Sequence, residues 1–134
     1  MKQSLFILVA IIMLTGCRQF YEHPDTRESF IGVYNATEFS ETYNVTNVFP
    51  MHITNNGAED DPGIIITNFS NLGEEVRARV TFFEFRIPRQ RIGDFNIEGS
   101  GRLGVNEVII DYTMENALDR EAPINILTAT LKSR

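Results

Sequence analysis

Arginines are the residues of this sequence best suited to binding chemistry. Five of them lie close together in the chain, at Arg77, Arg79, Arg86, Arg89 and Arg91. A guanidinium is always charged and presents a planar fork of N–H donors that matches carboxylate and phosphate groups. The cluster therefore predicts a positive patch suited to an anionic glycan, a lipid headgroup or an acidic protein.

Residue parity predicts that these arginines share one face if their two segments are neighbouring strands. Arg77 and Arg79 alternate with apolar residues and therefore point outward. Arg86 does the same if its apolar neighbours point inward. A bulge at Pro88 would bring the last two arginines to the same side and turn Gln90 inward.

An ion-pair ladder is the competing interpretation of the same arginines. Acidic residues with outward parity stand on these strands, at Glu75, Glu84 and Glu98. Opposite charges at facing positions of neighbouring strands stabilise a sheet. The arginines are thus either a recognition face or part of a solvated ladder, and both interpretations stay open here.

The other reactive side chains form no catalytic or metal-binding pattern. The two histidines, His23 and His52, belong to no HExxH motif, and no nucleophile elbow is present. The acidic run at residues 59–61 lacks the alternating spacing of a calcium loop, which favours a solvated turn. A single cysteine excludes both an internal disulfide and a cysteine-based zinc site. We therefore expect a protein that is not an enzyme and carries no metal or cofactor.

Composition limits the class of protein. The chain has 134 residues, of which 43% are hydrophobic and 22% charged, so it is long and apolar enough for one packed domain. Its 18 acidic residues outnumber 12 lysines and arginines, giving a formal net charge of −6. A sequence-independent nucleic-acid binder needs a basic surface, so we expect no nucleic-acid partner.

The N-terminus has the pattern of a secretory signal. One positive charge at Lys2 precedes an uninterrupted apolar run at residues 5–14. Ten residues of helix rise about 15 Å, roughly half of a bilayer's hydrocarbon core, so the run is a poor membrane span. The run ends in Leu14-Thr15-Gly16-Cys17, which resembles the lipobox of bacterial lipoproteins.

The lipobox resemblance implies that Cys17 is acylated with a diacylglyceryl group and that the chain is cut before it. An ordinary cleaved signal is the alternative. Three parts follow: a lipoprotein signal peptide at 1–16, the acylated cysteine with a polar tether at 17–29, and a folded domain at 30–134. The expected location is the cell envelope, with attachment through lipid to the outer membrane.

From Phe30 onward the apolar residues recur with a period of two, which is typical of strands. Eight strands are expected, at residues 30–39, 44–54, 64–69, 76–82, 85–92, 95–103, 108–114 and 124–132. Short strands separated by frequent turns predict an all-β fold, either an eight-stranded antiparallel meander barrel or a β-sandwich. In this assignment Phe82 continues its strand and points inward, and Gly99 and Gly101 mark a sharp bend.

Several short motifs resemble small lipocalin-like (calycin-like) lipoproteins of Gram-negative bacteria. They occur in the order Phe30-Ile31-Gly32-Val33-Tyr34, Ile87-Pro88-Arg89-Gln90, Gly99-Ser100-Gly101, Asp111-Tyr112-Thr113 and Thr128-Ala129-Thr130-Leu131. Gly32-Val33-Tyr34 is similar to the lipocalin Gly-x-Trp motif, with tyrosine in place of tryptophan. The resemblance implies an eight-stranded antiparallel meander, and a basic residue, Lys132 or Arg134, closing over that aromatic ring. It transfers no ligand.

These observations predict a membrane-anchored, non-catalytic binding module of the cell envelope. One alternative is an inhibitor or protective lipoprotein that blocks an enzyme with the polar connection at residues 115–123. Another is a carrier of a small apolar ligand. Eight strands make a barrel just wide enough to be filled by side chains. The expected interior is bulky, which favours recognition on the outer surface.

Overall fold

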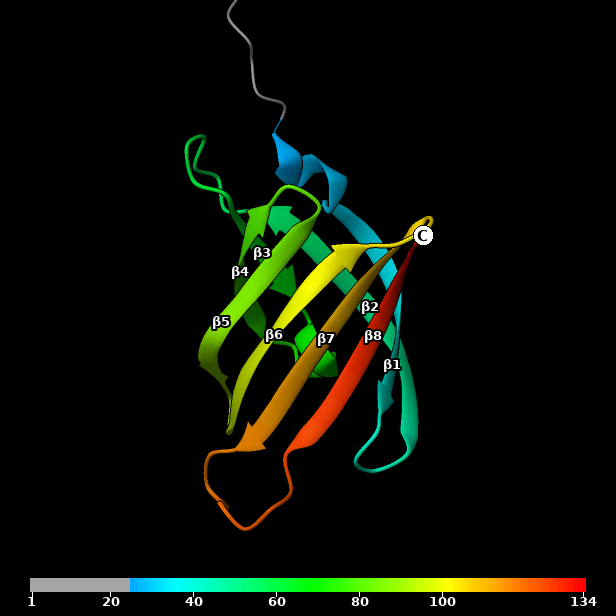
Figure 1. Cartoon of the computed structure of the whole chain (residues 1–134), viewed down its shortest axis with the longest axis vertical. Helices are drawn as coiled ribbons and strands as arrows, with labels where there is room; N and C mark the ends of the chain where they lie inside the picture. The colour runs from blue at the N-terminus through cyan, green and yellow to red at the C-terminus, as the bar shows by residue number, and fades with distance from the viewer. Residues whose placement is uncertain (1–24) are drawn as a thin grey trace, which may run out of the picture.

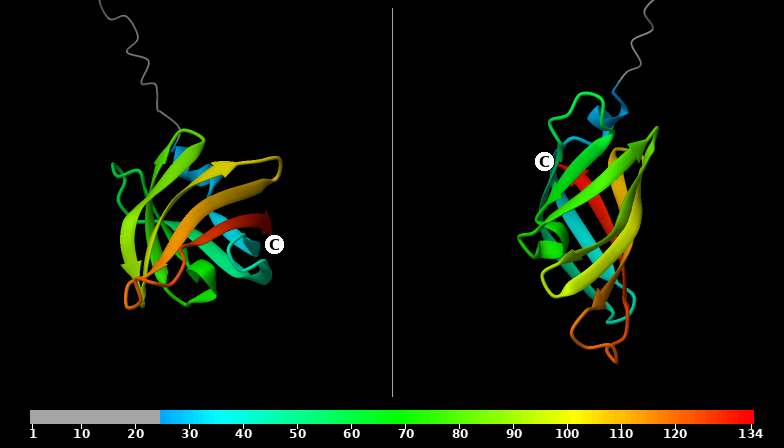
Figure 2. Two further views of the ribbon diagram at one scale, coloured as in Figure 1. Left: turned by 60° about the horizontal axis from the view of Figure 1, so that its bottom comes forward. Right: turned by 90° about the vertical axis from the view of Figure 1, so that its left-hand side faces the viewer.

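The computed structural model describes residues 25–134, which form a closed barrel of eight antiparallel strands (Figures 1 and 2). Each strand pairs with its neighbours in the chain, and β1 pairs with β8 to close the barrel. The strands are β1 (Gly32–Ser40), β2 (Val45–Asn55), β3 (Gly63–Thr67), β4 (Glu75–Thr81), β5 (Glu84–Ile92), β6 (Phe95–Leu103), β7 (Glu107–Asn116) and β8 (Asn125–Ser133). The meander barrel is therefore confirmed over the sandwich. The expected signal peptide, Cys17 and His23 lie outside the described residues.

Alternation of buried and exposed residues forms the interior, as the period of two predicts. In β4, Val76, Ala78 and Val80 are buried, while the residues between them are exposed. The bulge expected at Pro88 is confirmed, because the pairing of β5 with β6 shifts between Ile87 and Gln90. Large side chains fill the barrel, including Phe30, Phe69, Phe85, Met51, Ile53, Ile64, Ile66, Ile87, Ile97, Ile110 and Leu131.

One end of the barrel is covered by the short helix η1 (Thr26–Ser29) and the residue that follows it. Phe30 is fully buried there and meets the ring of Phe85 edge-on, with centroids 5.1 Å apart. Tyr34 is buried as well, and its hydroxyl donates to the carbonyl oxygen of Phe30 at 2.7 Å. The aromatic residue of the Gly-x-Trp-like motif thus fixes the chain as it enters the barrel.

Arg27 joins η1 to the loop between β2 and β3. Its side chain is almost completely buried and donates to the carboxylate of Asp25, to the side chain of Asn56, and to the carbonyl oxygens of Ala58 and Asp61. These hydrogen bonds satisfy a guanidinium that is removed from water. The hydrogen bonds from Arg27 also hold the pKa of Asp25 below its ordinary value.

Phe82 is the clearest departure from the expected inward set. It is 73% exposed and has a φ of 57°, because β4 ends at Thr81 and a two-residue turn, Phe82 and Phe83, leads into β5. The expectation that Phe82 points inward is therefore wrong. A residue in a tight turn leaves the alternation of the strand before it.

The two glycines of β6 serve close packing. The pairing of β6 with β7 runs through Gly99 and Gly101 without a shift in register. A Cβ at Gly101 would overlap the ring of Phe85, and one at Gly99 would overlap the backbone of β7 at Asp111 and Tyr112. Glycine at these positions lets the Phe85 ring and β7 approach the β6 backbone closely.

Candidate binding face

The five clustered arginines all lie exposed on the outer surface of β4 and β5. Arg79 stands directly opposite Arg86 in the antiparallel pairing of the two strands. Facing residues have Cβ atoms about 4.5–5.5 Å apart, and like charges in this arrangement are destabilising. The register thus places two guanidinium groups side by side on a chain whose net charge is negative.

The alternative of an ion-pair ladder holds for one arginine of the five. Arg89 pairs with Glu98 at 3.3 Å and with Glu115 at 2.5 Å. The hydrogen bond to Glu115 raises the pKa of Arg89 above its ordinary value. Within residues 25–134, no carboxylate lies within 4 Å of the guanidinium nitrogens of the other four arginines, Arg77, Arg79, Arg86 and Arg91.

Of the three acidic residues expected to complete the ladder, Glu98 pairs with Arg89, whereas Glu75 and Glu84 face other residues. Glu75 lies opposite Thr67 on β3. Glu84 lies opposite Thr81 on β4 and opposite Arg102 on β6, and Arg102 itself pairs with Asp111 at 2.5 Å. The residue that faces Arg79 on β5 is a second arginine, Arg86, and not one of these glutamates.

Gln90 fixes the position of Arg77, a role that the sequence did not reveal. Gln90 was expected to point inward, but its side chain lies between β4 and β5. The amide nitrogen donates to the carbonyl oxygen of Arg77 at 2.8 Å, and its oxygen accepts from the Arg77 N–H at 3.0 Å. The backbones of β4 and β5 pair only from Arg79 to Thr81. The side chain of Gln90 therefore supplies hydrogen bonds between the two strands at Arg77, where backbone pairing has ended.

Two shallow grooves flank the row formed by Arg77, Arg79 and Arg86. The larger, about 460 Å³, is lined by Arg86, Arg89, Glu98 and Ser100 among others. The smaller, about 210 Å³, lies over β3 and β4 and is lined by residues including Asn56, Asp61, Ile65, Arg77 and Arg79. Pro88 lines both grooves. An elongated ligand on this face would meet guanidinium groups from both strands.

A buried polar cluster inside the barrel is the second site that the sequence did not reveal. Glu38 is 3% exposed and accepts hydrogen bonds from the hydroxyls of Tyr112 and Ser70. Ser70 belongs to η2 (Phe69–Asn71), whose Phe69 ring packs on Tyr112 with centroids 4.6 Å apart. The sequence indicated the inward position of Glu38 only through its spacing, because Glu38 follows Tyr34 and Ala36 at intervals of two residues along β1. Glu38 and Tyr112 are buried and Ser70 is half-buried, so we interpret the cluster as structural.

The basic residues expected over the Gly-x-Trp-like aromatic are exposed at the C-terminus. Arg134 donates from Nε to the side chain of Asn35 at 2.8 Å, and Lys132 faces Asn35 across the β1–β8 pairing. The closed eight-stranded antiparallel barrel is consistent with a lipocalin-like fold. No protein-family model matches the sequence, and a comparison with curated proteins finds no match.

Proposed function

We propose that this protein is a lipid-anchored, non-catalytic binding module of the bacterial cell envelope. Its recognition surface is the outer face of β4 and β5, and its partner is an anionic glycan or an acidic protein. The observation that carries the proposal is the facing pair Arg79 and Arg86, which has no carboxylate partner among the described residues.

The physical reason is the cost of leaving this pair uncompensated. The chain carries more acidic than basic residues, so carboxylates for internal pairing are plentiful. The two arginines nevertheless face each other, and like charges at such positions weaken a sheet. A bound anion removes that repulsion and gains charge-assisted hydrogen bonds from both guanidinium groups.

The anchor part of the proposal rests on the lipobox-like Leu14-Thr15-Gly16-Cys17. Among the described residues, no helix is long and apolar enough to cross a membrane. Acyl chains on Cys17 would attach the protein to a membrane, since two or more chains hold a protein stably at a bilayer. We expect Cys17→Ala to release the protein from membranes washed with high salt, and full retention of this variant would contradict the anchor.

The binding test compares variants with equal changes of charge. Arg77→Ser/Arg79→Ser removes two arginines from the face, while Arg120→Ser/Arg134→Ser removes two exposed arginines elsewhere. Full-length proteins are passed over immobilised heparin and polygalacturonate, at low salt and at about 0.5 M salt, where screening shortens to a few Å.

We expect the wild type and the control to be retained at low salt and released at high salt. The Arg77→Ser/Arg79→Ser variant should pass through at both concentrations. Equal retention of the two double variants would show that β4 and β5 are ordinary charged surface. Circular dichroism melts verify that all three proteins are folded.

A second candidate function, enzyme inhibition, is favoured by the connection between β7 and β8. This loop projects from the barrel end opposite η1 (Figure 2). The side chain of Asn116 accepts hydrogen bonds from the N–H groups of Leu118 and Asp119, at 2.9 and 3.2 Å. Leu118 is 70% exposed on this internally braced loop. A rigid loop with an exposed apolar residue is what a blocking inhibitor needs.

The inhibitor test uses the same loop. The purified protein is titrated against a panel of glycan hydrolases, with Leu118→Asp as the variant. Inhibition that Leu118→Asp abolishes and Arg77→Ser/Arg79→Ser leaves intact would favour this function. A carrier function has less support, because large side chains occupy the barrel interior.

A further inference from the structure

The turn between β4 and β5 carries two exposed phenylalanines. Phe82 is 73% exposed and Phe83 is 70% exposed, so both rings project into solvent. Phe82 also has a positive φ of 57°, a left-handed conformation that is a genuine outlier for a bulky side chain. The short turns that join β1 to β2, β5 to β6 and β6 to β7 place residues suited to this conformation there, at Asn44, Gly93 and Asn106.

The aromatic turn is held in place by regular pairing. Thr81 faces Glu84 across the turn, and the carbonyl oxygen of Phe83 accepts a hydrogen bond from the N–H of Leu103 at 3.2 Å. Regular strand pairing thus holds the two rings in place, although the positive φ of Phe82 and the exposure of both rings to water cost free energy. Strain of this kind, when it is retained, points to a function at the strained position.

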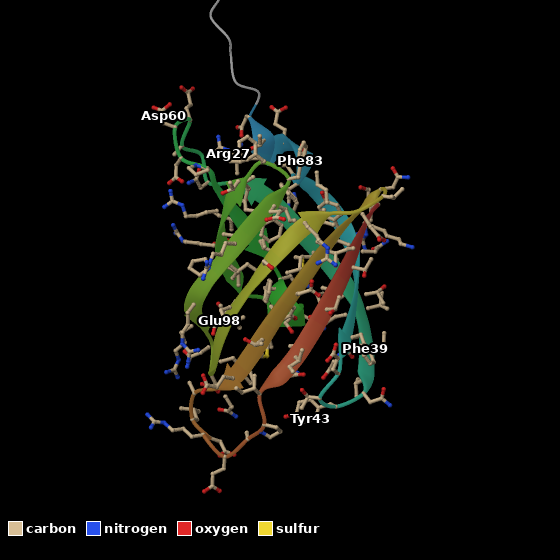
Figure 3. The ribbon with its side chains drawn as sticks, viewed as in Figure 1. Arg27, Phe39, Tyr43, Asp60, Phe83 and Glu98 are labelled. Atoms are coloured by element: carbon tan, nitrogen blue, oxygen red, sulfur yellow. The ribbon has the colours of Figure 1, made fainter. Side chains whose placement is uncertain are left out.

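The turn lies at the barrel end where the described chain begins. Figure 3 shows Phe83 and Arg27 at this same end of the barrel, whereas Tyr43 lies at the opposite end. Val105, 89% exposed, lies in the turn between β6 and β7, which the meander places at the same end as Phe83. Cys17 is eight residues before Asp25 in the sequence, a span of at most about 29 Å when fully extended.

We infer that the tip formed by Phe82 and Phe83 inserts into the interface of the lipid bilayer to which the chain is attached. This inference rests on the proposed anchor at Cys17. A short tether keeps this end near the bilayer, where the transfer of aromatic rings from water into the interface is favourable in free energy. Arg79 and Arg86 flank the turn, and the acidic loop at residues 59–61 lies at the same end, so charges of both signs are present there and we assign the insertion to the two apolar rings.

The chain contains no tryptophan, so one introduced tryptophan reports on one position. Phe83→Trp places the reporter at the tip, and Tyr43→Trp places the control at the opposite end, where Tyr43 is 54% exposed. Full-length proteins are reconstituted into vesicles of phosphatidylethanolamine and phosphatidylglycerol, with and without brominated acyl chains. Interfacial side chains lie about 5–10 Å into the headgroup boundary, within reach of these quenchers.

We expect the tryptophan at position 83 to emit at shorter wavelength in vesicles, to lose intensity with brominated lipid, and to resist aqueous iodide. The tryptophan at position 43 should stay at long wavelength and remain quenched by iodide. Equal iodide quenching at both positions would overturn the inference. So would shielding of position 83 that requires added envelope proteins, since the tip would then bind protein.

Flotation of the vesicles tests the lipid anchor at Cys17 separately from the insertion of the aromatic tip. If wild-type protein floats and the tryptophan at position 83 stays in water, insertion is wrong and the anchor stands. If wild-type protein fails to float, the anchor is wrong and the inference falls with it. Melting curves of both tryptophan variants establish that the barrel is intact.

Discussion

The phenolic hydroxyl of Tyr112 donates a hydrogen bond to the carboxylate of Glu38 inside the barrel, although 74 positions separate the two residues. Ser70 donates a second hydrogen bond to the same carboxylate at 3.2 Å. Burial raises the pKa of Glu38, because the charged form loses its hydration, and the two hydrogen bonds offset part of this effect. The cluster therefore joins β1, β7 and η2 through a group whose charge is unfavourable.

Replacing Glu38 should change how stability depends on pH. A folded-state pKa above the unfolded value means that the folded protein binds the extra proton more strongly, so stability falls as pH rises through that interval. Glu38→Gln has no proton to lose. We expect its free energy of unfolding, relative to that of the wild type, to increase as the pH rises above the ordinary pKa of a glutamate, measured by urea denaturation at a series of pH values.

Glu41→Gln, in the exposed turn after β1, is the control for removing a carboxylate from this region. Its stability should follow the wild-type curve across the same range of pH. Parallel curves for wild type and Glu38→Gln would instead mean that the Glu38 carboxyl has an ordinary pKa in the fold.

Gly101→Ala should destabilise the barrel. The added methyl group would overlap the Phe85 ring, which is itself packed edge-on against Phe30. Overpacking of this kind costs about 1–3 kcal/mol. Ser100→Ala, at the exposed neighbouring position, should stay within about 0.5 kcal/mol of wild type. Chemical denaturation of both variants measures the difference, and equal stabilities would show that the Phe85 ring moves aside freely.

Phe82→Asn should stabilise the protein. A left-handed conformation costs a bulky residue about 1–2 kcal/mol, and asparagine tolerates it far better, so we expect a gain of about 1 kcal/mol in the free energy of unfolding. Phe83→Asn removes an equally exposed ring from a position without a positive φ, and should give no such gain. Similar effects of the two substitutions on the melting temperature would contradict the strain at Phe82.

Reversing one charge of the facing arginine pair should strengthen the sheet. Arg79→Glu places a carboxylate opposite Arg86, and cross-strand pairs of opposite charge contribute about 0.2–1 kcal/mol. Arg86→Glu should act similarly, whereas the double reversal restores repulsion and loses the gain. A double-mutant cycle of unfolding free energies measures the coupling, and additive effects would mean that the two side chains do not interact.

The period of two was enough to predict the strands and the interior, because inward and outward residues alternate strictly in segments such as Val76 to Val80. Proline chemistry predicted the bulge in β5, since Pro88 cannot donate to the ladder. The closing of the sheet into a barrel depends on pairing between the first and last strands. No local pattern encodes that pairing, so the sequence alone is compatible with a sandwich as well as with a barrel.

The register between β4 and β5, which decides which residue faces Arg79, could not be predicted from local sequence patterns. The expected strand limits implied a turn at residues 83–84, which would set Arg79 opposite Pro88. The observed turn at Phe82 and Phe83 begins one residue earlier, which shifts each facing position by two and sets Arg79 opposite Arg86. Apolar Phe82 gave no signal for a left-handed turn, and Gln90 gave none for a bond to the neighbouring backbone.

The pairing of β1 with β8 makes the closure of the barrel a late step in folding. Every other strand contact joins consecutive strands and can form as soon as a hairpin is complete, whereas the β1–β8 seam joins segments such as Ala36 and Leu131. Closing so large a loop is slow compared with hairpin formation. Until the last strand arrives, the nascent sheet has two unpaired edges able to pair with other chains. We therefore expect the unpaired edges of β1 and β7 to need protection during synthesis until β8 is available to pair with both.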